Sequence, residues 1–106
     1  MIAYIAGPYR AKNKLGIASN ILKAYKVAME YWRKGYTVIT PHLNSAFMDG
    51  IIPDSNFLKR DLELLQFADV MVVLPGWERS KGTQKELWRA RQMGIKVIWV
   101  ENKKWT

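Results

Sequence analysis

A serine, a glycine and a glutamate in the last third of the chain have the spacing of an anion-binding and catalytic segment. Ser80, Gly82 and Glu86 stand two and four residues apart, where a helix is expected to begin. Exposed N–H groups and the helix dipole make a helix start an anion site, and glycine lets an anion approach the backbone. Glu86 shares the apolar face of this helix with Ala90 and Met93, where solvation does not explain a carboxylate. The segment predicts phosphate binding beside a reactive carboxylate; the alternatives are a simple helix cap and a glutamate that only stabilises the dipole.

A second polar segment follows a short apolar run near the start of the chain. It consists of Gly7, Pro8, Tyr9 and Arg10. Arg10 follows the Gly-Pro turn and can bind an anion. Tyr4 lies within the apolar run, and a buried tyrosine usually finds a hydrogen-bond partner. We expect its hydroxyl to meet a carboxylate such as Glu86.

Four further side chains are candidates with a structural alternative each. Asp61 lies on an apolar helical stripe, where it needs a partner. Asp69 opens a predicted strand at its amino end, which is the wrong end for a ligand. His42 follows a predicted strand, where it either contacts a ligand or has only a structural role. Trp77 could stack on a base or cover the core.

Strands and helices alternate along the chain. Apolar runs predict strands at 2–6, 36–40, 69–74 and 96–100, and helical spacing predicts helices at 14–34, 56–67 and up to residue 93. Residues 41–55 are expected to be irregular, with Ser55 as the N-cap of the helix that follows. The sheet-facing side of the first helix is expected to carry Leu15, Ala18, Leu22, Tyr25, Met29 and Trp32.

This alternation predicts an α/β fold in three α/β/α layers. Residues 1–106 form one domain with a four-stranded parallel sheet of order 2-1-3-4, flavodoxin- or Rossmann-like. Ligands bind beyond the carboxyl ends of such strands, where the strand order reverses. That point lies between the first and third strands and receives the two polar segments.

Composition excludes several classes of site. The 106 residues include no cysteine and one histidine, which excludes disulfides, thiolate nucleophiles and zinc sites built on cysteine. We expect no metal and no cofactor. No apolar run approaches ~18 residues and no signal peptide is recognised, so a cytoplasmic protein without a membrane partner is expected.

The chain has 17 Lys and Arg against 9 Asp and Glu, which gives a net charge of +8. This charge either attracts anionic ligands or only reflects a solvated basic surface. Nucleic acid is not the expected partner, because neither a recognition helix nor an aromatic platform is recognisable. A carboxylate pair beside a phosphate site suggests glycosidic cleavage on a sugar phosphate, which needs a nucleophile and an acid.

The order and spacing of these motifs resemble the nucleoside 2-deoxyribosyltransferase superfamily over nearly the whole chain. Residues 4–10 (YIAGPYR) resemble its opening strand and turn, and 61–73 (DLELLQFADVMVV) resemble its 2'-deoxynucleoside 5'-monophosphate N-hydrolases. The Ser-x-Gly-x-x-x-Glu spacing of 80–86 matches those hydrolases, and 74–82 is closest to a small bacterial and phage branch of unassigned function.

The resemblance implies roles for individual residues. Glu86 corresponds to the nucleophile, Tyr4 to the tyrosine that orients it, and Asp69 to an acid that helps protonate the leaving base. Ser80 replaces an acid that would repel phosphate, so with Arg10 it favours a 5'-phosphorylated substrate. A nucleotide or nucleoside substrate and a homodimer or higher homo-oligomer are expected.

Two other functions stay open. A phosphoribohydrolase-like enzyme would use Pro75 and Gly76 with Gly82 and Glu86, although the separation of the glycines does not fit that family's motif. A nucleotide-binding protein without turnover would keep Arg10 and tolerate the loss of Glu86.

Overall fold

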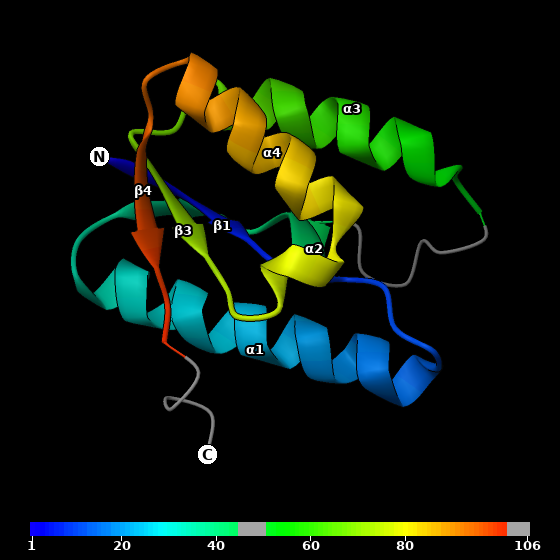
Figure 1. Ribbon diagram of the computed structural model, residues 1–106. Coiled ribbons are helices and arrows are strands. Elements are labelled where there is room, and N and C mark those ends of the chain that lie inside the picture. The colour runs from blue at the N-terminus through cyan, green and yellow to red at the C-terminus, as the bar shows by residue number, and fades with distance from the viewer. Residues whose placement is uncertain (45–50, 102–106) are drawn as a thin grey trace.

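The computed structural model describes residues 1–44 and 51–101. Helices and strands alternate along the chain, as the sequence predicted (Figure 1). The strands are β1 (Ile2–Ala6), β2 (Thr37–Ile39), β3 (Val70–Val73) and β4 (Lys96–Trp99). The helices are α1 (Lys14–Arg33), α2 (Pro41–Asn44), α3 (Asp54–Leu65) and α4 (Lys81–Gln92), with a 3₁₀ turn η1 (Trp77–Arg79) before α4.

The four strands form one parallel sheet in the order β2-β1-β3-β4, which confirms the predicted topology. Ala3 of β1 lies opposite Val38 on one side and Val70 on the other, so β1 is an interior strand. The strand order reverses between β1 and β3, as expected for a ligand site at their carboxyl ends.

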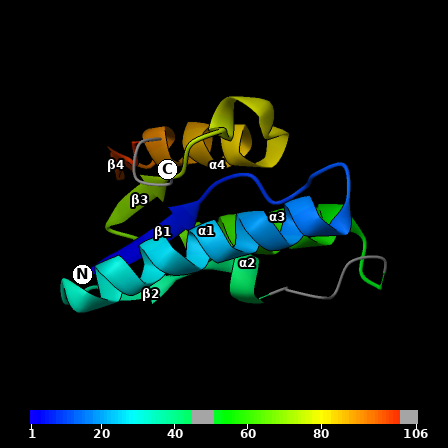
Figure 2. The same ribbon diagram turned by 90° about the horizontal axis from the view of Figure 1, so that it is seen from below.

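Side chains of alternate residues divide the core into two halves, one on each face of the sheet. Ala3 and Ile5 of β1 pack on α1, whereas Tyr4 and Ala6 pack on the side of α3 and α4. Figure 2 looks onto α1, which crosses in front of β1 and β2. The three layers of the predicted fold are therefore present.

The face of α1 that packs on the sheet differs from the predicted one. Its buried residues are Ala24, Val27, Ala28 and Tyr31. The predicted stripe is mostly exposed: Leu15 has 82% of its surface accessible, and Leu22, Tyr25 and Trp32 are also exposed. The alanines carry no bulk beyond Cβ, so they let the helix lie close to the strands, and the larger side chains fall beside the contact.

The connection between β2 and β3 contains more helix than expected. Residues 41–44 form α2, and α3 begins at Asp54 with Pro53 as its N-cap. Ser55 therefore lies inside the helix and is not its cap. The intervening residues 45–50 lie outside the described part of the chain.

Two glycines allow the turns at the carboxyl end of the sheet. A Cβ on Gly7 would lie 2.6 Å from the Cβ of Leu74, so only glycine fits where the chain leaves β1 beside β3. Gly76 has a φ of +89°, a conformation that favours glycine, and it starts the turn into η1. These turns bring the two polar segments to the same edge.

Candidate active site

A cavity of about 1210 Å³ opens at the carboxyl end of β1 and extends between α3 and α4. Eight of the residues singled out from the sequence line it: Gly7, Tyr9, Arg10, His42, Asp61, Ser80, Gly82 and Glu86. It lies where the topology places a ligand site. Tyr4 stands behind this wall, and Pro8, Asp69 and Trp77 are not part of the lining.

Glu86 is held in the wall of the cavity by a hydrogen bond from the sheet. Its side chain projects from α4 and is only 7% exposed. The Tyr4 hydroxyl, fully buried on β1, donates to Glu86 Oε2. Burial raises the pKa of Glu86 to about 8; the Tyr4 hydrogen bond opposes this rise and the charge of Asp61 adds to it. The expected pairing of Tyr4 with Glu86 is present.

Asp61 provides a second carboxyl in the same cavity. It projects from α3, and burial raises its pKa to about 6. Its charge acts on both Glu86 and Tyr4 and raises the pKa of each. Two carboxyls with different pKa values therefore share one site, which is the arrangement that separates an acid from a nucleophile.

Asp69 lies at the other end of the sheet from Glu86. Its Oδ2 accepts a hydrogen bond of 2.6 Å from the backbone N–H of Ile2, and its own N–H donates to the Ile2 carbonyl at 2.8 Å. These bonds join the amino ends of β1 and β3. The structure thus brings Asp61, and not Asp69, together with Glu86, because a residue that opens a parallel strand cannot reach the strand's carboxyl end.

Ser80 immediately precedes α4 and caps it. Its Oγ accepts hydrogen bonds from the backbone N–H of Thr83 at 3.2 Å and from the Thr83 hydroxyl at 2.8 Å. Gly82 leaves room at this helix start, since a Cβ there would meet only Leu58, at 3.9 Å. On the neighbouring loop, the Arg10 guanidinium lies 5.5 Å from the centre of the Tyr9 ring. Ser80 therefore caps the start of α4, and this helix start also borders the cavity.

His42 fastens the loop that follows β1. Its Nε2 donates to the carbonyl of Pro8 at 2.9 Å, and its ring lies 5.8 Å from that of Tyr9. Burial lowers the pKa of His42, which favours the neutral ring. His42 lines the cavity and also sets the position of Pro8, so both of its predicted roles are compatible with its place.

Trp77 covers the edge of the core. Its ring lies 5.2 Å from that of Trp99 on β4, and it packs against the buried residues between the sheet and α4. This placement matches the interpretation that Trp77 covers the core. Trp77 is not part of the cavity lining, so base stacking there is left to other aromatic residues.

Sequence reasoning placed too few basic residues in the site. The cavity is also lined by Lys59, Arg79, Lys81, Lys85 and Arg89, together with the indole of Trp88. The signal was available: Lys81, Lys85 and Arg89 are spaced four residues apart, which aligns them along one side of a helix. Within residues 1–44 and 51–101, no three His, Asp or Glu side chains are grouped to hold a metal ion, and no helix is long and apolar enough to cross a membrane.

The fold is shared with a solved enzyme structure. A 2-deoxyribosyltransferase from the psychrotolerant bacterium Bacillus psychrosaccharolyticus superposes with a TM-score of 0.66 at 21% sequence identity, over 98% of this chain and 79% of that one. This likeness confirms the fold that the sequence resemblance implied. No curated protein matches the chain. The model of DUF4406, described as a domain of unknown function, matches residues 1–99, and the chain therefore belongs to the DUF4406 family.

Proposed function

We propose that the protein breaks the N-glycosidic bond of a nucleotide, with Glu86 as the nucleophile and Asp61 as the proton donor. The observation that carries this proposal is the buried Glu86, oriented by Tyr4 and sharing its cavity with Asp61. The likeness to a 2-deoxyribosyltransferase supports the reaction class. Asp61 takes the role that the sequence resemblance gave to Asp69.

The reaction follows from the two carboxyls. A Glu86 oxygen attacks the anomeric carbon, and a C–O bond forms as the C–N bond to the base breaks. The electron pair of the broken bond stays on the base, which takes the proton of Asp61. Water then attacks the glycosyl-enzyme, gives a proton to Asp61 and restores the Glu86 carboxylate. The products are the free base and the sugar phosphate.

Tyr4 orients the nucleophile. Its hydroxyl donates to one oxygen of Glu86, which leaves the other for attack. Burial makes Glu86 more basic, and the positive charge that develops on the sugar favours its ionised form. Removing the hydroxyl would free the carboxylate to rotate and would raise the pKa of Glu86 further.

The phosphate of the substrate is assigned to the start of α4 and to Arg10. Both border the cavity that holds Glu86. The dipole of a twelve-residue helix and a guanidinium attract a 5'-phosphate. A free nucleoside would forgo these interactions, so the monophosphate is the preferred form.

The pH dependence of the rate is expected to be bell-shaped. The reactive form of the pair has one proton, on Asp61, while Glu86 is ionised. Because Glu86 has the higher pKa, this is the minor of the two singly protonated forms, and the major one has its proton on Glu86. Below the pKa of about 6 of Asp61 both groups are protonated, and above the pKa of about 8 of Glu86 both are ionised. The maximum of kcat/KM should fall between these values.

Base release is the direct test. The protein is incubated with each deoxynucleoside 5'-monophosphate, each ribonucleotide and each free deoxynucleoside, with and without an acceptor base, and products are separated by chromatography. Glu86→Gln should abolish release, whereas Glu78→Gln, a change at an exposed glutamate outside the cavity, should not. A nucleotide that protects the protein from heat without being cleaved would favour a binding protein instead.

The choice of the leaving group separates the two carboxyl roles. Asp61→Asn should lose release of an ordinary base but keep release of an N7-methylated guanine, which departs without a proton. Glu86→Gln should lose both, because no leaving group replaces a nucleophile. The opposite pattern would exchange the roles of the two residues.

A further inference from the structure

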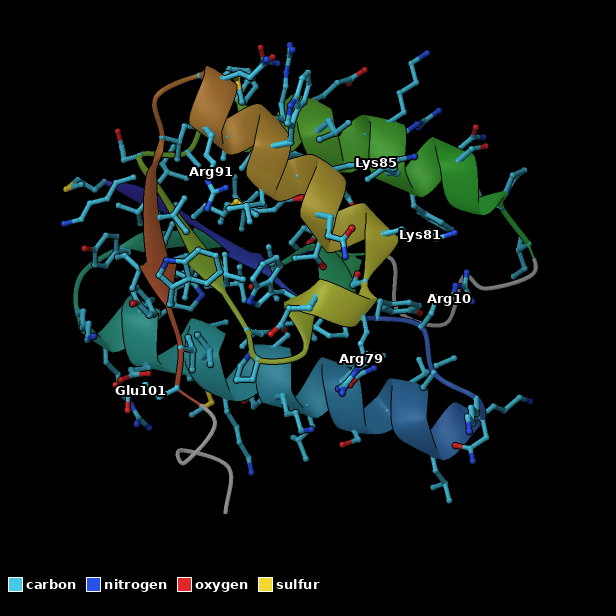
Figure 3. The ribbon with its side chains drawn as sticks, in the orientation of Figure 1. Arg10, Arg79, Lys81, Lys85, Arg91 and Glu101 are labelled. Atoms are coloured by element: carbon cyan, nitrogen blue, oxygen red, sulfur yellow. The ribbon has the colours of Figure 1, made fainter. Side chains whose placement is uncertain are left out.

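Three cations form a row along the cavity side of α4. Lys81, Lys85 and Arg89 are exposed and all line the cavity. Four residues of helix rise by ~6 Å, so the row spans ~12 Å along the axis. Figure 3 shows Lys81 and Lys85 extending to the side of the molecule on which Arg10 lies, whereas Arg91 of the same helix lies on the side of β4.

Aromatic rings accompany this row. Trp88 stands next to Arg89, lines the same cavity and is 61% exposed. Phe57 lines the cavity from α3 and is half-buried. An exposed tryptophan among cations is the combination on which the bases of a single strand stack. The sequence alone did not place Trp88 in the site.

One monophosphate does not account for these groups. The start of α4 and Arg10 suffice for a single 5'-phosphate, yet the row continues two turns farther along α4. The cavity of about 1210 Å³ is larger than the ~300–1000 Å³ typical of a pocket that encloses a small ligand. In the described part of the chain, no salt bridge to a carboxylate neutralises Lys81, Lys85 or Arg89.

The length of the row distinguishes between phosphorylated ligands. The phosphates of a nucleoside triphosphate share bridging oxygens and stay together, so they fit at one end of the row. Successive phosphates of a strand are separated by whole sugars and spread along it. The net charge of +8 also favours a polyanion over a mononucleotide.

We propose that the substrate is a nucleotide within single-stranded nucleic acid, whose phosphates follow Lys81, Lys85 and Arg89 while a neighbouring base stacks on Trp88. The chemistry rests on the proposed function: Glu86 and Asp61 act on one unpaired base of the strand. An unpaired base reaches the carboxyls without the energy needed to open a duplex. Glu86 displaces the base and water then cleaves the glycosyl-enzyme, so the products are a free base and a strand with one abasic sugar.

Binding is measured first, because it does not depend on turnover. The probe is a fluorescein-labelled, mixed-sequence DNA single strand about 12 nucleotides long, within the ~4–16 nucleotides that single-strand binding folds cover. Fluorescence anisotropy is followed from ~50 mM salt upward, with deoxynucleoside monophosphates as competitors. An RNA strand of the same sequence is the second arm and identifies the preferred sugar.

Variants of the row should weaken this binding specifically. Lys85→Gln and Arg89→Gln should each raise Kd about fivefold and reduce the slope of log Kd against log salt by ~0.7, the value for one phosphate contact. Trp88→Ala should raise Kd about tenfold through lost stacking. Arg91→Gln is the matched control, since Arg91 is an exposed arginine of α4 that does not line the cavity. Thermal melting of each variant verifies that it folds.

The outcomes separate this inference from the proposed function. Strand binding that depends on the row, with base release from the strand at a higher kcat/KM than from the monophosphate, supports both. Row-dependent binding with no base release from any substrate supports the strand surface and contradicts the proposed reaction. Base release from monophosphates with no row-dependent strand binding, or with equal effects of Arg89→Gln and Arg91→Gln, overturns the inference alone.

Discussion

Replacing the proposed nucleophile Glu86 by glutamine should stabilise the fold, by an amount that grows with pH. The carboxyl of Glu86 titrates near 4.5 in an unfolded chain and at about 8 in the folded protein. Between these values the unfolded chain has released the proton that the folded protein keeps. Each pH unit therefore lowers the free energy of unfolding by ~1.4 kcal/mol, or about 5 kcal/mol over the whole interval.

Glutamine removes this dependence while it preserves the contacts. It has nearly the shape of a protonated glutamate, and its carbonyl oxygen can accept the hydrogen bond of Tyr4. The variant and the wild type should therefore have similar stability near ~pH 5, where Glu86 is protonated. By ~pH 8 the variant should be more stable by about 5 kcal/mol, a large part of the ~5–15 kcal/mol of a typical domain.

Urea denaturation followed by tryptophan fluorescence measures this difference across the pH range. Glu78→Gln is the matched control, because it makes the same chemical change at an exposed glutamate outside the cavity. A Glu86→Gln difference that stays constant with pH would refute the burial argument. So would a variant that is less stable than the wild type at ~pH 8. The predicted result would mean that Glu86 lowers the stability of the fold near ~pH 8. A residue with a purely structural role would not be expected to destabilise the protein in this way.

Three further predictions concern the turns, the second carboxyl and the helix cap. Gly7→Ala places a methyl group 2.6 Å from a neighbouring Cβ and should cost ~1–3 kcal/mol in urea denaturation, whereas Gly82→Ala, with its nearest neighbour at 3.9 Å, should not destabilise. Asp61→Asn should lower kcat at least ~100-fold in the base-release assay, while Asp69→Asn should keep activity; the reverse would restore the role that the family resemblance implies for Asp69. Ser80→Ala removes the cap of α4 and should lower the free energy of unfolding by ~1 kcal/mol, and an unchanged urea midpoint would contradict that capping role.

The fold could be predicted because its signals are local and mutually consistent. Strands such as 70–73 are continuous apolar runs ended by Pro or Gly, and their alternation with helices leaves few topologies. The packed face of α1 could not be predicted from side-chain size. Two apolar stripes run along that helix, and the sheet takes the one with Ala24 and Ala28, because close approach buries more surface than large side chains at a distance.

The site could be predicted in part. Glu86, Tyr4 and Arg10 were found because their positions follow from strand ends and helix starts. The strand pattern placed Asp69 at the wrong end of the sheet for a ligand, and only the family resemblance gave it a role in the site. The structure shows Asp69 bonded to the strand beside it. That Asp61 reaches the cavity depends on the position of α3, which the sequence pattern does not fix.

The interior position of β1 has a consequence for how the chain emerges from the ribosome. β1 is translated before both of its neighbours, and its second partner, Val70–Val73, follows more than sixty residues later. At ~5–20 residues per second, several seconds pass before that partner has been made. Throughout this interval the nascent chain carries a largely apolar strand with no completed sheet to receive it. We therefore expect residues 2–6 to be covered during synthesis, by a chaperone or by α1 folding early against them.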